Sequence, residues 1–246
     1  MPILNSTNME NHRIGGSNFG FSAKRIDDLG ASEYTLGLVI VDVSGSVTPF
    51  RMEIEGAIKE IVRSCRHNPR ADNMMLRVVF FDDGVTEFHG FKPLTECNED
   101  DYNGCVQIGG MTALYDASYS GIKSATQYGE DLTKQDFDVN AAVFVVTDGQ
   151  DNRSRVTRAM VKQALSEAVT SEALESIVAV LIGLNAHGHL DQYLEDFKTE
   201  AGFTQYVGVA DATAKTLARL GKFVSQSFSS QSQALGTGGP SQSLSF

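Results

Sequence analysis

Short runs of apolar residues are separated by longer segments with helical spacing along the middle of the chain. The runs are rich in Val, Ile, Leu and Phe, which is typical of strands that are buried on both faces of a parallel sheet. These predicted strands cover residues 34–42, 76–81, 141–147, 177–184 and 203–209. A further run, at 85–91, follows the turn signal Asp82-Asp83-Gly84 and is predicted to return as an antiparallel edge strand.

The segments between the strands place apolar residues three and four positions apart, as amphipathic helices do. One helix is predicted to begin with Thr48 as its N-terminal cap and Pro49 in its first turn. Strands that alternate with helices form βαβ units. The pattern therefore predicts an α/β fold of the Rossmann-like, doubly wound kind. Its sheet is expected to be mainly parallel with one antiparallel edge strand, and helices are expected on both faces.

The two ends of the chain differ from the middle in composition. Residues 1–32 are polar, and we expect a loosely ordered arm that docks on the domain through Phe19 and Phe21. Residues 229–246 are rich in Ser, Gln and Gly, so a flexible tail is predicted there. A single domain is expected between them, at 33–228.

Composition narrows the classes of function. The chain has 246 residues and a formal net charge of -11, which argues against a nucleic-acid partner. No run of about 18 apolar residues is present, so no membrane span is expected. The three cysteines lack the spacing of a disulfide framework or a zinc site. Together with the polar start of the chain, this favours a cytoplasmic protein.

Oxygen-bearing side chains gather where predicted strands end. Asp42, Ser44 and Ser46 follow the first apolar run, and alternate residues of an extended segment point the same way. Thr112 stands just before a predicted helix, and Asp148 follows another predicted strand. Open α/β sheets bind ligands at the carboxyl ends of their strands. Two carboxylates and three hydroxyls are hard ligands that suit Mg²⁺, with Mn²⁺ or Ca²⁺ as alternatives.

Each of these residues also has an ordinary structural interpretation. Asp and Ser favour caps and turns, Thr112 is a plausible helix cap, and Asp148-Gly149 is a turn signal. Asp116 and Asp151 lie close to the same positions in the sequence. A capping or supporting hydrogen bond is favoured over ligation for Asp116, and a loop or helix-start role is favoured for Asp151. Only the combination of three separate places favours a metal site over capping alone.

Three motifs, taken in order along the chain, resemble those of the von Willebrand factor type A (vWA) domain family. They are DxSGS at 42–46, GGxTALYDA at 109–117 and VVTDGxD at 145–151. The resemblance extends over 33–228 in its order of strands and helices. The motifs look like the metal ion-dependent adhesion site (MIDAS) of that family. The residues at 81–83 are similar to intracellular bacterial members of the TerY type, which implies a stress-response or phage-defence role.

The resemblance also implies a role for each candidate residue. Ser44, Ser46 and Thr112 resemble ligands that bind the metal directly, whereas Asp42 and Asp148 resemble ligands that act directly or through water. In the family, the open coordination position often takes an acidic side chain, so the implied partner is a protein that presents Glu or Asp. Family members of this type often work beside an AAA+ ATPase or a kinase.

Three classes of function follow from these observations. The favoured one is a metal-dependent protein–protein interaction module without enzymatic activity. A Mg²⁺-dependent hydrolase or phosphatase is the alternative, because Asp42 stands where a phosphoryl-transfer nucleophile would stand. Against it, Ser44 occupies the position at which a phosphotransferase carries a second Asp. The third class is a structural assembly component whose arm and tail order on neighbouring subunits.

Overall fold

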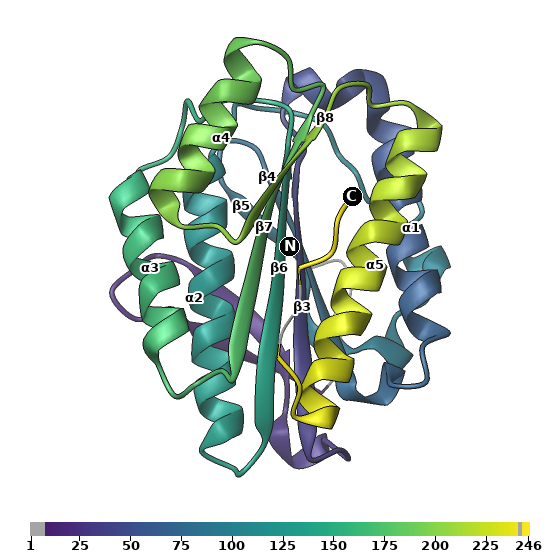
Figure 1. The fold of residues 1–246 in the computed structure, drawn as a ribbon, viewed down its shortest axis with the longest axis vertical. Helices are drawn as coiled ribbons and strands as arrows, with labels where there is room; N and C mark the ends of the chain where they lie inside the picture. Colours follow the sequence, from purple (N-terminus) through teal and green to yellow (C-terminus); the bar gives the residue numbers. More distant parts are fainter. Residues whose placement is uncertain (1–7, 241–242) are drawn as a thin grey trace.

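The elements of the protein form three layers, with a sheet between two layers of helices (Figure 1). The computed structural model describes residues 8–240 and 243–246. One face of the sheet is covered by α1 (Arg51–Arg66) and α5 (Ala214–Thr237). The other face is covered by α2 (Leu114–Thr133), α3 (Arg158–Thr170) and α4 (His189–Ala201). This arrangement confirms the predicted α/β class with helices on both faces.

The sheet has eight strands in the order β1-β2-β5-β4-β3-β6-β7-β8. The strands are β1 (Met9–Arg13), β2 (Gly20–Lys24), β3 (Glu33–Asp42), β4 (Met74–Phe81), β5 (Val85–Pro93), β6 (Asp138–Thr147), β7 (Ser176–Leu184) and β8 (Gln205–Val209). Strands β4, β3, β6, β7 and β8 run parallel to one another. β5 pairs with β4 in the antiparallel direction, as the turn signal before it predicts. β2 and β1 then continue the sheet beyond β5.

The central strand β3 shows why its sequence is almost wholly apolar. Leu38 and Ile40 pack into the core under α2, whereas Val39 and Val41 pack into the core under α1 and α5. All four side chains are buried because successive residues of a strand point to opposite faces. Burial on both faces leaves the carboxyl end of the strand as the place where its polar residues begin.

The start of α1 differs from the prediction. Residues Gly45–Phe50 form a 3₁₀ segment, and the α-helix itself begins at Arg51. Thr48 is not the N-terminal cap, because its hydroxyl donates to the carbonyl of Gly45 over 2.7 Å. The 3₁₀ segment therefore begins directly after Ser44, whose carbonyl accepts the N–H of Val47 at 3.2 Å.

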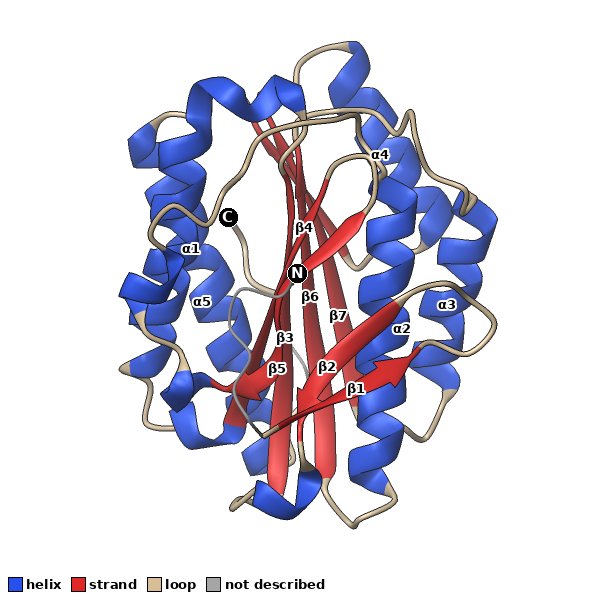
Figure 2. Ribbon diagram, turned by 180° about the vertical axis from the view of Figure 1, so that it is seen from behind, coloured by secondary structure: helices blue, strands red, loops and turns tan. Residues whose placement is uncertain are grey.

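The polar arm proposed for residues 1–32 contributes two strands to the sheet, as the view from behind shows (Figure 2). Residues 1–7 lie outside the described part of the chain. Phe21 is buried as expected, but polar contacts also hold β2. The Glu87 carboxylate accepts hydrogen bonds from the Ser22 backbone N–H at 3.0 Å and hydroxyl at 2.6 Å, and from Arg77 Nε at 2.7 Å. The composition of the arm does not indicate these contacts, because Arg77 and Glu87 lie far from it in the sequence.

The predicted tail boundary at residue 229 is also crossed by regular structure. Helix α5 continues to Thr237, so the prediction of a flexible tail is wrong for that part of the chain. Some of its polar residues are packed, since Ser232 is fully buried and accepts a hydrogen bond from Arg70 Nε at 3.0 Å. The segment beyond folds back, and the Phe246 ring packs edge-on against Phe223. The division into arm, domain and tail otherwise stays a prediction.

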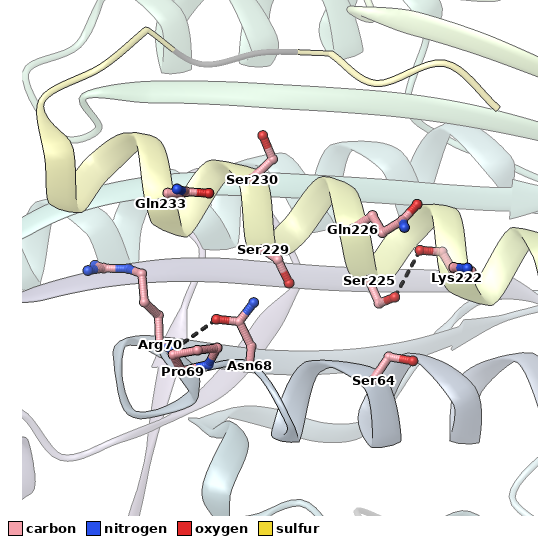
Figure 3. A pocket seen from close by; sticks show the side chains of 10 residues that line it. All are labelled: Ser64, Asn68, Pro69, Arg70, Lys222, Ser225, Gln226, Ser229, Ser230 and Gln233. Atoms are coloured by element: carbon pink, nitrogen blue, oxygen red, sulfur yellow. Dashed lines mark hydrogen bonds between the residues drawn. The ribbon is translucent and has the colours of Figure 1, made fainter.

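A polar groove runs along this part of α5 (Figure 3). Ser225 and Ser229 of the helix point toward the side of α1, where Asn68 and Arg70 complete the wall. The groove explains why Ser and Gln are tolerated on this helix, because one side meets polar partners and the other meets the sheet. Among the described residues, no helix has the length and apolar character needed to cross a membrane.

Candidate metal centre

The candidate residues lie at the carboxyl ends of two neighbouring parallel strands. Asp42 is the last residue of β3, and Thr147 is the last residue of β6. The two strands pair in register up to Val41 and Val146, so their ends meet at the same edge of the sheet. Asp148 follows immediately and faces the loop that comes after β3. The βαβ pattern of the sequence therefore places the two carboxylates side by side, as expected.

Asp42 is held in one orientation by hydrogen bonds to both of its carboxylate oxygens. Oδ1 accepts the backbone N–H of Ser44 at 2.8 Å, and Oδ2 accepts the hydroxyl of Thr147 at 2.6 Å. The side chain is almost completely buried. The carboxylate is thus positioned before any ion arrives, which lowers the entropic cost of forming a site around it.

The two serines join the carboxylates into a continuous set of oxygen atoms. Ser44 Oγ lies 3.1 Å from Ser46 Oγ, and Ser46 Oγ donates to Asp148 Oδ1 over 2.7 Å. Ser46 is exposed, whereas Ser44 is buried. The cluster therefore has a closed side toward the strand ends and an open side toward solvent.

Thr112 reaches the same cluster from a different loop. Its backbone N–H donates to Asn152 Oδ1 at 2.8 Å, and its carbonyl accepts the N–H of Asn152 at 3.0 Å. The Thr112 hydroxyl lies against Gly149, where a β-carbon would sit only 3.3 Å away from it. A larger residue at position 149 would crowd this hydroxyl. The loop before Thr112 is tied to the β3 end by the N–H of Gly109, which donates to the Val43 carbonyl at 2.9 Å.

Hydrogen bonds thus link Asp42, Ser44, Ser46 and Asp148, and Thr112 lies beside Gly149, the residue after Asp148. The role of the five residues as metal ligands stays a prediction. Burial raises the pKa of Asp42, although hydrogen bonds from Ser44 and Thr147 oppose the change. Burial also raises the pKa of Asp148 to about 6, and the nearby Asp42 carboxylate adds to the increase. Two carboxylates drawn out of water beside each other are stabilised by a cation between them.

The donor set decides which ions fit. Among the described residues, no group of three or more His, Cys, Asp or Glu side chains has the arrangement of a metal site. A centre here would therefore rely on two carboxylates and three hydroxyls, which are all oxygen donors. Such a donor set suits Mg²⁺, because this ion retains several water ligands and is often bound by only one or two carboxylates of a protein.

Two further aspartates shape the loops rather than the oxygen cluster. Asp151 Oδ2 accepts the backbone N–H of Tyr115 at 3.0 Å, in the first turn of α2. Asp116 Oδ1 accepts the backbone N–H groups of Arg155 and Val156 at 3.0 and 2.8 Å. The helix-start role favoured for Asp151 and the supporting hydrogen bond favoured for Asp116 are both seen.

Asp82 and Asp83 stand in the turn after β4 and make different contacts. Asp82 makes the expected turn, because Gly84 N–H donates to its Oδ1 at 3.3 Å. Asp83 extends to the rim of the centre, where its Oδ1 accepts the N–H of Met111 at 3.0 Å. The turn after β4 therefore supports the loop that carries Thr112.

Two residues of the centre were not among the sequence candidates. Thr147 orients Asp42, and Asn152 fixes the backbone of Thr112. Thr147 could have been noticed as a hydroxyl at a strand end, directly before Asp148. Asn152 had no comparable signal, because its side chain acts on the backbone of a residue 40 positions away.

The chain is similar to known proteins in its fold, whereas comparisons of its sequence find no match. No family model and no curated protein sequence matches the chain. Among solved structures, the PilB minor pilin from Streptococcus sanguinis has a TM-score of 0.57 and 15% identity, covering 88% of this chain and 66% of that one. A von Willebrand factor type A protein from Catenulispora acidiphila has a TM-score of 0.55 and 15% identity, covering 84% of this chain and 44% of that one.

A third structure adds a metal to the comparison. Proximal thread matrix protein 1 from the mussel byssus, with a zinc-occupied MIDAS motif, has a TM-score of 0.51 and 19% identity. The match covers 79% of this chain and 46% of that one. The chain thus spans between 44% and 66% of the length of these three structures. At such identities the likeness shows the fold, and the chain has the fold of vWA domains.

Proposed function

We propose that this protein is a metal-dependent protein-interaction module whose centre is a MIDAS-type site. The observation that carries the proposal is the cluster formed by Asp42, Ser44, Ser46, Thr112 and Asp148, which is closed toward the sheet and open toward solvent. A divalent cation held there supplies an electrophilic position for an oxygen ligand from outside. The side chains of this protein would hold that ion in place, and the exposed side of the cluster, at Ser46, leaves space for a partner.

Mg²⁺ is the proposed ion, with Mn²⁺ or Ca²⁺ as alternatives. The all-oxygen donor set supports a hard cation. The zinc-occupied MIDAS of the mussel thread matrix protein supports occupancy of such a centre by a divalent ion. The proposed ligand from outside is a Glu or Asp of a protein partner, since a carboxylate would neutralise charge at the ion.

The geometry of Asp42 supports a binding function over a hydrolytic one. A nucleophilic carboxylate must be presented to its substrate, but Asp42 is almost completely buried, with its oxygens turned toward Ser44 and Thr147. Ser44, at the position of a possible second acid, contacts Ser46 instead. We therefore propose that the protein is not an enzyme.

The place of the protein in the cell is also a proposal. All three cysteines are free and buried, which supports a reducing compartment such as the cytoplasm. The net charge of -11 supports a partner other than nucleic acid. A TerY-like role beside an AAA+ ATPase or a kinase rests on the sequence motifs alone. The assembly role is less favoured, because β1 and β2 pair within the chain's own sheet.

Metal titration tests the centre directly. We expect wild-type protein to bind Mg²⁺ in calorimetry, and Ser46→Ala or Thr112→Ala to weaken that binding by about tenfold, or ~1.4 kcal/mol. Ser166→Ala is the matched control, because this exposed serine lies on α3. Circular dichroism should show the same fold for all variants. Equal Mg²⁺ affinity in wild type and Ser46→Ala would refute the assigned ligand set.

Affinity capture tests the interaction. Wild-type protein is expected to retain a partner in Mg²⁺ and to release it in EDTA, and Ser46→Ala should capture less. A partner retained equally with EDTA would show that binding does not pass through the metal centre.

A further inference from the structure

A groove of about 450 Å³ lies beside the candidate metal centre. One wall is the turn between β1 and β2, at Gly16–Phe19, and the other is the loop after β6 together with the start of α3. Both ribbon views show this turn next to α2 and α3 (Figures 1 and 2). The vWA-like motifs do not include the turn, so the groove is a feature that the N-terminal strands add.

One hydrogen bond and one neighbour in the sequence connect the groove to the Thr112 loop of the candidate metal centre. Asp83, which lines the groove, accepts the N–H of Met111, the residue before Thr112. On the opposite wall, Arg153 lines the groove and directly follows Asn152, which holds the backbone of Thr112. The groove therefore borders the loop that carries Thr112.

Among the charged side chains that line the groove, one arginine is left without an ion-pair partner among the described residues. The Asp116 carboxylate is buried and occupied by the N–H groups of Arg155 and Val156. Asp83 lies 3.8 Å from Arg153 Nε. Arg155 is exposed and forms no ion pair with any described residue. Its guanidinium is thus free to pair with a carboxylate from outside.

The apolar groups of the groove include an exposed side chain. Phe19 and Tyr119 form a tilted aromatic pair with ring centroids 6.2 Å apart. Met160, at the start of α3, is 42% exposed, and Met111 at the rim is 45% exposed. Large exposed apolar side chains beside a polar rim mark protein-binding surfaces, and methionine adapts its shape to a partner.

We propose that this groove binds the segment of the partner that adjoins the carboxylate at the metal. The segment carries a large apolar side chain, which packs on Phe19, Tyr119 and Met160, and an acidic side chain, which pairs with Arg155. This inference rests on the proposed function, because the metal defines where the segment begins. An acidic and apolar peptide segment is thus the class of ligand that the surface selects.

A display library of short random peptides, selected on the full chain in Mg²⁺, tests the proposal. The wild-type protein is expected to enrich peptides in which Asp or Glu stands beside an aromatic or aliphatic residue. The test variant is Met160→Glu with Arg155→Glu. Met160 lies in the first turn of α3, where Glu suits the helix dipole, so the variant is expected to fold. The control is Val169→Glu with Arg25→Glu, which also replaces one apolar residue and one arginine by Glu, on exposed side chains outside the groove.

Synthetic copies of the enriched peptides then give affinities by fluorescence anisotropy. The groove variant is expected to bind them roughly tenfold more weakly, whereas the control binds as wild type does. The proposal is overturned if the wild-type selection shows no acidic and apolar preference. It is equally overturned if the groove variant binds the selected peptides as tightly as the control.

The same assay in EDTA and with Ser46→Ala separates the two proposals. Binding that is lost in EDTA but unchanged in the groove variant supports the metal centre and rejects the groove. Binding that persists in EDTA but weakens in the groove variant supports the groove and rejects the metal-dependent function.

Discussion

Individual residues of the centre differ in how visible they are in the sequence. Asp42, Ser44 and Asp148 could be found because each follows an apolar run that ends at the same edge of a parallel sheet. Thr147 was read as part of its strand, although its hydroxyl binds Asp42. Asn152 acts on a backbone amide, and such contacts depend on loop geometry that no residue pattern encodes.

His89 on β5 provides a prediction about pH. Burial lowers its pKa to about 3, and the positive charge of Lys92 adds to the decrease. The Gly90 carbonyl can only accept, so Nδ1–H donates to it at 2.9 Å, and Nε2 then accepts the Tyr102 hydroxyl at 2.7 Å. The neutral ring is therefore fully hydrogen-bonded, and protonation would place an unpaired charge in the core.

The sign of the effect follows from proton uptake. Below the ordinary histidine pKa of about 6.5, the unfolded chain binds a proton that the folded chain does not. We expect this residue to lower the free energy of unfolding by about 1.4 kcal/mol per pH unit as the pH falls from about 6.5 toward 3. Denaturant titrations at several pH values measure this slope. His89→Gln should reduce it and His187→Gln, on an exposed loop, should not; identical slopes in His89→Gln and wild type would contradict the assignment.

Secondary structure elements were predictable where their partners are close in the sequence. The alternation of strands and helices between β3 and β8 follows from local hydrophobic spacing. β1 and β2 did not follow from it, because β2 is held by Arg77 and Glu87 of distant strands. The end of α5 was also missed, because polar residues such as Ser232 are buried there against Arg70. The amino-acid composition of a segment gives its mean polarity, but it does not show which of its polar groups form hydrogen bonds in the fold.

Strands β2 and β5 lie so close together at Gly90 that adding a single methyl group there tests their packing. A β-carbon at Gly90 would lie 1.9 Å from the backbone oxygen of Ser22, so Gly90→Ala must push the two strands apart. We expect a loss of about 1–3 kcal/mol in unfolding free energy and faster hydrogen exchange at Gly20–Lys24.

Gly56→Ala is the matched control for this substitution. Gly56 lies on the exposed side of α1, where an added β-carbon meets nothing within 4 Å. Alanine there should raise stability by about 0.5–1 kcal/mol, because glycine is a poor helix former. Unchanged exchange in β2 of Gly90→Ala would mean that the strand is not packed as described.

The whole molecule has one hydrophobic core on each face of the sheet, and all three cysteines lie in the core under α1 and α5. Burial raises the pKa of Cys65 to about 12, of Cys97 to about 11 and of Cys105 to about 12. At neutral pH these side chains remain thiols, and the thiolate is the reactive form.

The native protein is therefore expected to resist thiol reagents. A chromogenic disulfide reagent should detect no fast-reacting thiol in the folded protein and all three after denaturation in guanidinium. Rapid labelling of any one cysteine in native buffer would show that the core under α1 and α5 opens more readily than its packing implies.

The two outermost strands of the sheet bear on how the protein behaves at high concentration. β1 and β8 have five residues each, whereas β3 and β6 at the centre have ten. β1 also carries the polar side chains of Glu10, His12 and Arg13. Both outer strands are short, and β1 is also charged, so a second molecule finds little backbone to pair with, which discourages growth into aggregated sheets. With a net charge of -11 the molecules also repel one another. Dense solutions of this protein should therefore stay dispersed.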